Sequence, residues 1–171
     1  MATSTVTKSR RSVARKAGAP GAPKDALQLL KADHREVEQW FEEFEDAHGS
    51  AAKAKLVQKI CLALKVHTQI EEEILYPATR QKTKDNDLVD EAVVEHAAAK
   101  DLIAQLEAAK PGDDLYDAKV QVLGEQIKHH VKEEEHEMFP EIKQSGMDLI
   151  AIGEQLAARK QELMSQLSGK P

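Results

Sequence analysis

Apolar residues recur along the chain at intervals of three and four, which places them on one face of an α-helix. Five segments show this pattern: residues 25–47, 50–76, 87–110, a segment from about 113 to the region of Pro140, and 147–167. Short connections between consecutive helices favour antiparallel neighbours. The pattern predicts an all-α fold, an up-down antiparallel four-helix bundle with an additional C-terminal helix packed outside or across it.

Turn-forming residues and prolines mark the predicted helix ends. Ser50 is a candidate N-cap of the second helix, and the acidic Asp113 or Asp114 suits the start of the fourth. Pro77 and Pro140 occupy equivalent places in the second and fourth helices. Because proline lacks an N–H and crowds the preceding turn, each is expected to kink or end its helix.

One phrase occurs twice, towards the ends of the second and fourth segments. It reads His-x3-Glu, then more acidic residues, then an apolar pair and proline, and it begins at His67 and again at His130. Residues four apart lie one turn apart on the same helix face. Each copy therefore directs an imidazole and a carboxylate, Glu71 or Glu134, to the same side of its helix.

Histidines lie within the apolar stripes of all four predicted bundle helices. A single histidine on an apolar face is usually a hydrogen-bonded core residue, but four helices repeating it favour a shared site. Two glutamates share these stripes, and ionised carboxylates are seldom buried unpaired. A bound cation would balance them. The predicted metal ligands are His34, His67, Glu71, His96, His130 and Glu134.

Other histidines and acids fit this inner face less well. His48 lies at the end of the first helix, and His129 and His136 are rotated away from the stripe of the fourth. A solvated acidic rim is predicted for Glu72, Glu73, Glu133, Glu135 and Glu137. Glu38, four residues after His34, is left open as a further ligand.

The predicted ligand set combines nitrogen and oxygen donors and contains no thiolate. It excludes cysteine-rich zinc and iron–sulfur sites and suits two iron or manganese ions bridged by carboxylates. The alternative in helical bundles is a ferritin-like site with two Glu-x-x-His pairs. Only Glu133 and His136 have that spacing, whereas His-x3-Glu occurs at both expected places.

Composition agrees with one helical domain over residues 25–168. The 171 residues are 41% hydrophobic, 32% charged and only 4% aromatic. The single cysteine, Cys61, rules out an internal disulfide and has apolar neighbours typical of a packed thiol. No apolar run approaches the ~18 residues of a membrane span, and the start lacks the apolar region of a signal peptide. We therefore expect a cytoplasmic protein.

Charge is divided unevenly between the start of the chain and the rest. Residues 1–24 contain six basic residues and no acid, whereas the remainder has 18 basic and 30 acidic residues, a formal charge of −12. The first segment lacks apolar periodicity and is predicted to be a disordered basic arm. It is either a solubilising tail, a transit-like segment, or a binding segment for an anionic partner such as nucleic acid.

These motifs resemble the hemerythrin-like (HHE cation-binding) proteins. The similarity rests on Asp33-His34 in the first helix, the two His-x3-Glu-to-proline phrases, and Glu95-His96 in the third helix, and it covers about residues 25–163. The resemblance implies a non-haem di-iron centre, with iron favoured over manganese or zinc. In it, the four histidines cap two irons, and Glu71 and Glu134 bridge them.

One position departs from the oxygen-carrying hemerythrins that the chain resembles. They hold a second histidine one turn after the first in helix 3, where this chain has Lys100. The resemblance therefore implies a centre that binds O₂, NO or peroxide for sensing, stress protection or iron handling rather than oxygen carriage. Weak peroxide or NO catalysis is a further reading. The alternative is an iron- or oxygen-responsive module that acts through a protein partner or nucleic acid.

Overall fold

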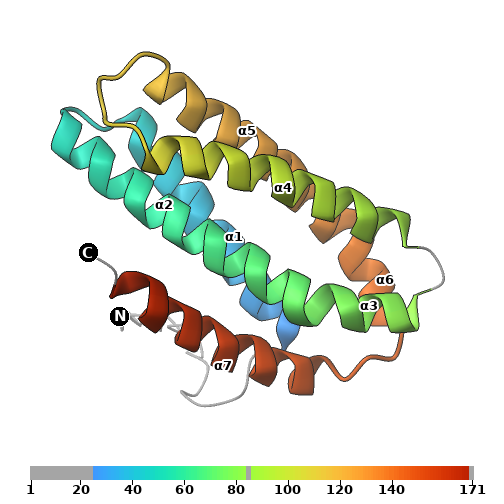
Figure 1. The fold of residues 1–171 in the computed structure, drawn as a ribbon. Coiled ribbons are helices and arrows are strands. Elements are labelled where there is room, and N and C mark those ends of the chain that lie inside the picture. Colours follow the sequence, from blue (N-terminus) through green and yellow to red (C-terminus); the bar gives the residue numbers. More distant parts are fainter. Residues whose placement is uncertain (1–24, 84–85, 170–171) are drawn as a thin grey trace, which may run out of the picture.

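Four long helices form the bundle in this computed structural model, which describes residues 25–83 and 86–169. They are α1 (Ala26–Glu45), α2 (Ser50–Ile70), α4 (Asp87–Glu107) and α5 (Tyr116–Glu133), and they alternate in direction (Figure 1). Both α1 and α4 pack against α2 and α5, which closes the bundle. All regular structure in the described ranges is helical, so the predicted fold class is confirmed. The predicted basic arm, residues 1–24, lies outside those ranges.

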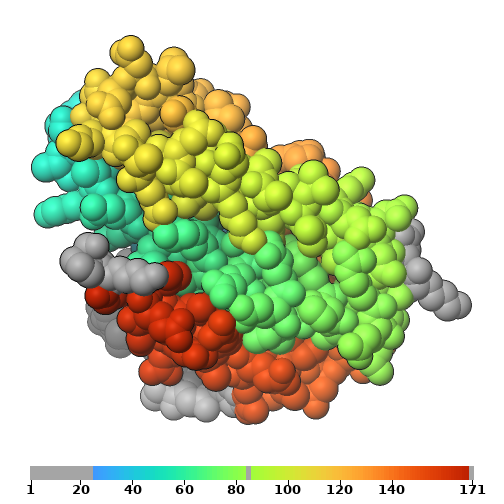
Figure 2. Space-filling view, viewed as in Figure 1, coloured from blue at the N-terminus to red at the C-terminus, as the bar shows by residue number. Residues whose placement is uncertain are grey.

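The additional helix is α7 (Leu149–Ser168), which packs along the outside of the bundle against α1 and α2 (Figure 1). Its apolar stripe faces inward: Leu156 is fully buried and Leu163 nearly so. Figure 2 shows α7 beside α2 on one face of the molecule. Among the described helices, none combines the length and apolarity that crossing a membrane requires.

Side-chain caps and glycines set several helix ends. The Asp25 side chain accepts a hydrogen bond from the backbone N–H of Gln28 and caps α1. Two sequence predictions are wrong here. Gly49, with φ of 91°, is the N-cap of α2 and Ser50 is the first helical residue. Helix α5 begins at Tyr116 rather than at Asp113 or Asp114, after a left-handed residue at 115.

Neither proline ends its helix, so of the two predicted outcomes, a kink or an end, the structure excludes the end. Each follows one π-helical turn, η1 (Glu71–Leu75) or η2 (Glu134–Met138), and the helix then continues as α3 (Tyr76–Lys82) or α6 (Phe139–Gln144). In an α-helix, proline crowds the carbonyl four residues earlier. The wider π turn, in which the N–H of Tyr76 bonds to the carbonyl of Glu71, accommodates the proline.

The hydrophobic core is split into two clusters along the bundle axis. One contains Leu30 of α1 and Ile70 of α2, and the other contains Val37 of α1 and Leu64 of α2. On both helices a buried histidine lies between the two clusters. A polar layer therefore crosses the middle of the bundle, with apolar packing above and below it.

We expect Cys61 to resist thiol reagents in the folded protein. Its side chain is 1% exposed, and burial and the charge of Glu107 raise the pKa of the thiol to about 12. At pH 8 the group therefore stays protonated, and the protonated thiol is not nucleophilic. Reaction with Ellman's reagent should be complete in urea and negligible without it; rapid reaction of the folded protein would contradict the packing of α2.

Candidate metal centre

Four imidazoles converge in the polar layer, one from each bundle helix. His34 of α1, His67 of α2, His96 of α4 and His130 of α5 are all buried, with at most 6% exposed. Their Nε2 atoms meet in pairs: His34 and His67 are 3.1 Å apart, and His96 and His130 are 3.2 Å apart. Both pairs thus direct their Nε2 atoms towards the centre of the bundle.

Two carboxylates lie between these pairs, at the first residue of each π turn. Glu71 and Glu134 are at most 2% exposed. Glu71 spans the two pairs, with Oε1 3.2 Å from Nε2 of His67 and Oε2 3.5 Å from Nε2 of His96. Glu134 Oε2 lies 3.3 Å from Nε2 of His34. All four carboxylate oxygens lack a hydrogen-bond partner.

The structure brings together all six residues proposed as ligands from the sequence. They form two groups with converging donor atoms, and Glu71 belongs to both: His34, His67, Glu71 and Glu134 in one, and Glu71, His96 and His130 in the other. Glu38 is not among them, because its half-exposed carboxylate pairs with Arg35. His48, His129 and His136 are exposed.

Two glutamates assigned to the solvated rim belong instead to the surroundings of the imidazoles, and that part of the rim prediction is wrong. Glu135 is 6% exposed and accepts a hydrogen bond from Nδ1 of His34 at 2.8 Å. Glu72 Oε1 lies 3.0 Å from Nδ1 of His96. Glu73 and Glu137 lie nearer the surface, as expected of a rim.

The other two imidazoles have equivalent partners. Glu95 Oε2 lies 2.8 Å from Nδ1 of His130, and Asp33 Oδ2 lies 3.7 Å from Nδ1 of His67, an ion-pair rather than a hydrogen-bond distance. These four outer carboxylates form a ring, in which each helix supplies the acid for the histidine of the next. The ring runs from α1 to α2, α4, α5 and back to α1. An acid at Nδ1 fixes the tautomer that leaves Nε2 free for a metal.

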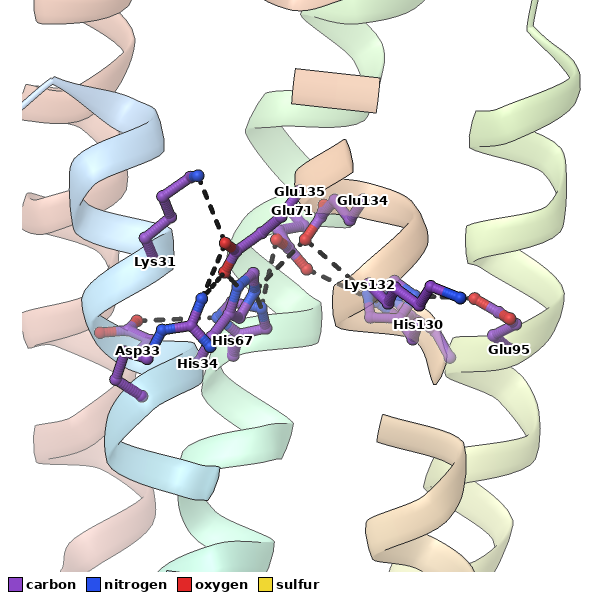
Figure 3. A network of polar contacts seen from close by, with 12 residues as sticks. Lys31, Asp33, His34, His67, Glu71, Glu95, His130, Lys132, Glu134 and Glu135 are labelled. Atoms are coloured by element: carbon purple, nitrogen blue, oxygen red, sulfur yellow. Dashed lines mark hydrogen bonds and ion pairs between the residues drawn. The ribbon is translucent and has the colours of Figure 1, made fainter. Parts of the chain in front are cut away.

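A further shell of charge surrounds the outer carboxylates. Their partners are Lys31 and Arg35 for Glu135, Lys100 for Glu72, Lys160 for Asp33, and His129 for Glu95. Figure 3 shows Glu135 between Lys31 and His34, and Glu95 beside His130. The Lys160 contact comes from α7, so the additional helix also reaches this shell.

The outer carboxylates occupy recognisable positions in the sequence, next to residues of the apolar stripes, but they lie outside the stripes themselves. Asp33 and Glu95 each precede a stripe histidine by one residue, and Glu72 and Glu135 each follow a stripe glutamate. One residue corresponds to about 100° of rotation, which turns these side chains towards a neighbouring helix rather than the bundle axis.

Aromatic rings from the two prolyl segments cover the site. Phe139 stacks on His34 at 6.1 Å between ring centroids, and Tyr76 stacks on His96 at 5.5 Å. The two positions correspond in the repeated phrase, but only Tyr76 carries a hydroxyl. That oxygen lies 3.3 Å from Nε2 of His96, which makes the two halves of the site chemically different.

Burial and the neighbouring charges shift the pKa values of the imidazoles and carboxylates in this layer. Burial alone would lower the pKa of His67, but the carboxylates of Glu71 and Asp33 raise it to about 10. Burial and the neighbouring His130 lower the pKa of His96 to about 4. Burial would raise the pKa of Glu71, yet the surrounding imidazoles lower it. A cation that binds here must therefore displace the proton of His67, so its affinity rises with pH.

The fold and these converging donors define a cation-binding helical bundle. The model of the hemerythrin HHE cation-binding domain family matches residues 25–142. The chain therefore belongs to this family, whose members bind metal cations. Helix α7 lies beyond the matched residues.

The chain is similar to a protein of known structure and to a longer curated protein. One is the crystal structure of a hemerythrin HHE cation-binding domain-containing protein from Mycobacterium kansasii, which is 25% identical, with a TM-score of 0.71 over 84% of this chain and 89% of that one. The other is a protein of Nostoc sp. named DNA nickase, 25% identical over 144 residues. That match covers 83% of this chain and 41% of the relative, so this chain spans about two fifths of its length.

Replacing Glu135 with glutamine should weaken metal binding about 10–100-fold, because the amide no longer holds Nδ1 of His34 as a carboxylate does. Affinity for Co²⁺ can be measured by competition with a chelator. Glu137→Gln is the matched control, since it removes the same charge two residues away from an exposed side chain. Equal effects of the two substitutions would mean that Glu135 acts only through its charge.

Proposed function

We propose that this protein holds two iron ions in the polar layer, with His34 and His67 at one ion and His96 and His130 at the other. Glu71 and Glu134 would lie between the two ions. The observation that carries this proposal is Glu71 itself, whose two oxygens face imidazoles of different pairs, 3.2 and 3.5 Å away. A carboxylate placed in this way is suited to bridging two metals.

The donor set supports iron in this site. Buried carboxylate oxygens without hydrogen-bond donors are costly unless a cation neutralises them. Imidazole nitrogen and carboxylate oxygen suit iron, manganese and zinc, whereas soft thiolate ligands are lacking among the six residues. Four imidazoles with two bridging acids are the ligand set expected of a di-iron hemerythrin-like centre, so iron is the metal we favour over manganese or zinc.

The proposed ligands of the centre are O₂, NO or peroxide, and its role is sensing, stress protection or iron handling. Two ferrous ions held by these residues would supply two electrons to O₂ or to peroxide. The protein contributes the rest: the outer carboxylates orient the imidazoles, and apolar clusters on both sides of the layer exclude water. These features favour a small uncharged ligand over a bulky substrate.

In this proposal, the presence of Lys100 favours reaction with oxygen over reversible oxygen carriage. Its ammonium group contacts both oxygens of Glu72 at 2.6 Å, and Glu72 in turn contacts His96. Lys100 is therefore engaged with the outer shell, where the oxygen carriers have an additional imidazole one turn after the first. With one nitrogen donor fewer, the proposed centre would leave room for water, NO or peroxide, which favours reaction over reversible carriage.

The iron content of purified protein tests the proposed centre. After anaerobic reconstitution and desalting we expect close to two irons per chain, and loss of about one in His130→Ala, because Nε2 of His130 faces the centre. His48→Ala is the control, since this exposed imidazole lies outside the groups of converging donor atoms. A content near zero in a wild-type protein with normal circular dichroism would exclude the centre.

The second candidate function is a regulatory or binding module that engages nucleic acid. It is favoured by the similarity to part of the Nostoc protein named DNA nickase and by the six basic residues within residues 1–24. In this reading the bundle senses iron or oxygen and the basic segment contacts phosphates.

Deletion of residues 1–24 tests the second candidate. The shortened protein should retain its iron and its melting temperature, because the deleted segment lacks apolar residues patterned for the core. Its affinity for duplex DNA should fall, and the salt dependence of binding should become shallower. If the full chain and the shortened chain bind DNA equally at every salt concentration, the basic segment has no role in nucleic-acid binding.

A further inference from the structure

A third group of metal-ligating side chains lies at the surface next to His130. It consists of Glu95 of α4 and, one turn apart on α5, His129 and Glu133. Nε2 of His129 lies 3.1 Å from Oε1 of Glu133 and 3.6 Å from Oε1 of Glu95. The His129 side chain is 63% exposed, and the two acids are about one quarter and one third exposed. We call this group the surface triad.

The surface triad has the composition of a cation site rather than of an acidic patch. One imidazole and two carboxylates converge from two helices, with donor atoms within 4.8 Å of one another. Ligands about 2.0–2.2 Å from a shared metal are separated by roughly 3–4 Å, and the distances from His129 Nε2 to Glu133 and Glu95, 3.1 and 3.6 Å, agree with this. The set suits Fe²⁺, Mn²⁺, Co²⁺ and Zn²⁺.

Glu95 connects the surface triad with the buried centre. Its Oε2 contacts Nδ1 of the buried His130 at 2.8 Å, while its Oε1 faces the exposed His129 (Figure 3 shows the inner contact). One carboxylate therefore contacts a surface imidazole and a centre imidazole simultaneously.

A pocket between α4 and α5 is lined by residues of both sites. Its polar lining comprises Glu95 and Glu133 of the surface triad together with His130 and Glu134 of the centre. Glu134 is buried, and its carboxylate oxygens have no hydrogen-bond partner. An unpaired buried carboxylate on the inner side of this pocket favours inward movement of a cation.

The other three outer carboxylates are less suited to guiding a cation inward. Basic side chains neutralise them: Lys31 and Arg35 at Glu135, Lys100 at Glu72, and Lys160 at Asp33. A fixed positive charge at each of these positions repels an approaching metal ion. Among the described residues around the centre, Glu95 is thus the outer carboxylate whose outer partner is an imidazole, a side chain able to bind a metal.

We propose that the surface triad binds a divalent cation and is the place from which metal passes between α4 and α5 into the buried centre. The passage rests on the proposed function of that centre, whereas binding at the triad does not. Because the surface triad contacts solvent and the buried centre does not, an ion at the triad exchanges faster and binds more weakly than the buried ions.

Co²⁺ binding to the full chain tests the triad directly. Stoichiometry measured by equilibrium dialysis should be one ion lower in His129→Ala and in Glu133→Gln than in the wild type. The difference between wild type and variant reports the triad, and the number that remains in the variant reports the buried centre. Equal stoichiometries in wild type and both variants would overturn the triad, whatever number the centre holds.

The rate of anaerobic Fe²⁺ uptake tests the passage. Both variants should load about tenfold more slowly than the wild type and reach the same final content of tightly held iron. His48→Ala and Glu137→Gln are the controls, since each removes an exposed imidazole or carboxylate outside the triad and should load at the wild-type rate. Equal loading rates in all five proteins would overturn the passage, as would equal slowing by the controls, which would mean that general surface charge attracts the iron.

Discussion

The buried carboxylates of Glu71 and Glu134 impose the constraint on which the rest of this structure depends. Removing an ionised group from water costs several kcal/mol unless partners compensate it, and these four oxygens accept no hydrogen bond within the described protein. Everything around them supplies compensation. Imidazoles from four helices face them, the core divides into two clusters to admit this layer, and the donor set matches a cation of the family to which the chain belongs.

Charge alternates outward from that constraint. Central carboxylates meet imidazoles, imidazoles meet outer carboxylates, and these meet basic side chains or His129 at the surface. Each shell of groups stabilises the shell inside it. A carboxylate at Nδ1 makes the imidazole a stronger metal ligand, and a basic side chain stabilises that carboxylate. Helix α7 participates through Lys160, which contacts Asp33, and through Arg159, which contacts Glu73. A helix beyond the matched family residues thus supports the His67 side of the layer.

The two halves of the site, the His34–His67 pair and the His96–His130 pair, have the same arrangement but different neighbouring side chains. Phe139 and Tyr76 occupy matching positions over His34 and His96, but only the tyrosine brings a hydroxyl to the centre. Lys100 is engaged by Glu72 on that same half. In the same half, Glu95, the outer carboxylate of His130, contacts the exposed imidazole of His129. The symmetrically arranged imidazoles and central carboxylates therefore lie in asymmetric surroundings.

The sequence by itself determined the helices and the composition of the inner layer. The period of 3.6 residues places Leu30, His34 and Val37 on one helix face, and a spacing of four residues places His67 and Glu71 on one face. These features therefore follow from local geometry. Tertiary structure alone decided which side chains meet between helices. Glu135 reaches His34 across 101 positions and Lys160 reaches Asp33 across 127. Such contacts depend on the rotation and register of packed helices, which a periodic pattern within one helix does not contain. Periodicity also does not reveal the π turns before the prolines, because proline ordinarily kinks or ends a helix and a wider turn departs from the period of 3.6.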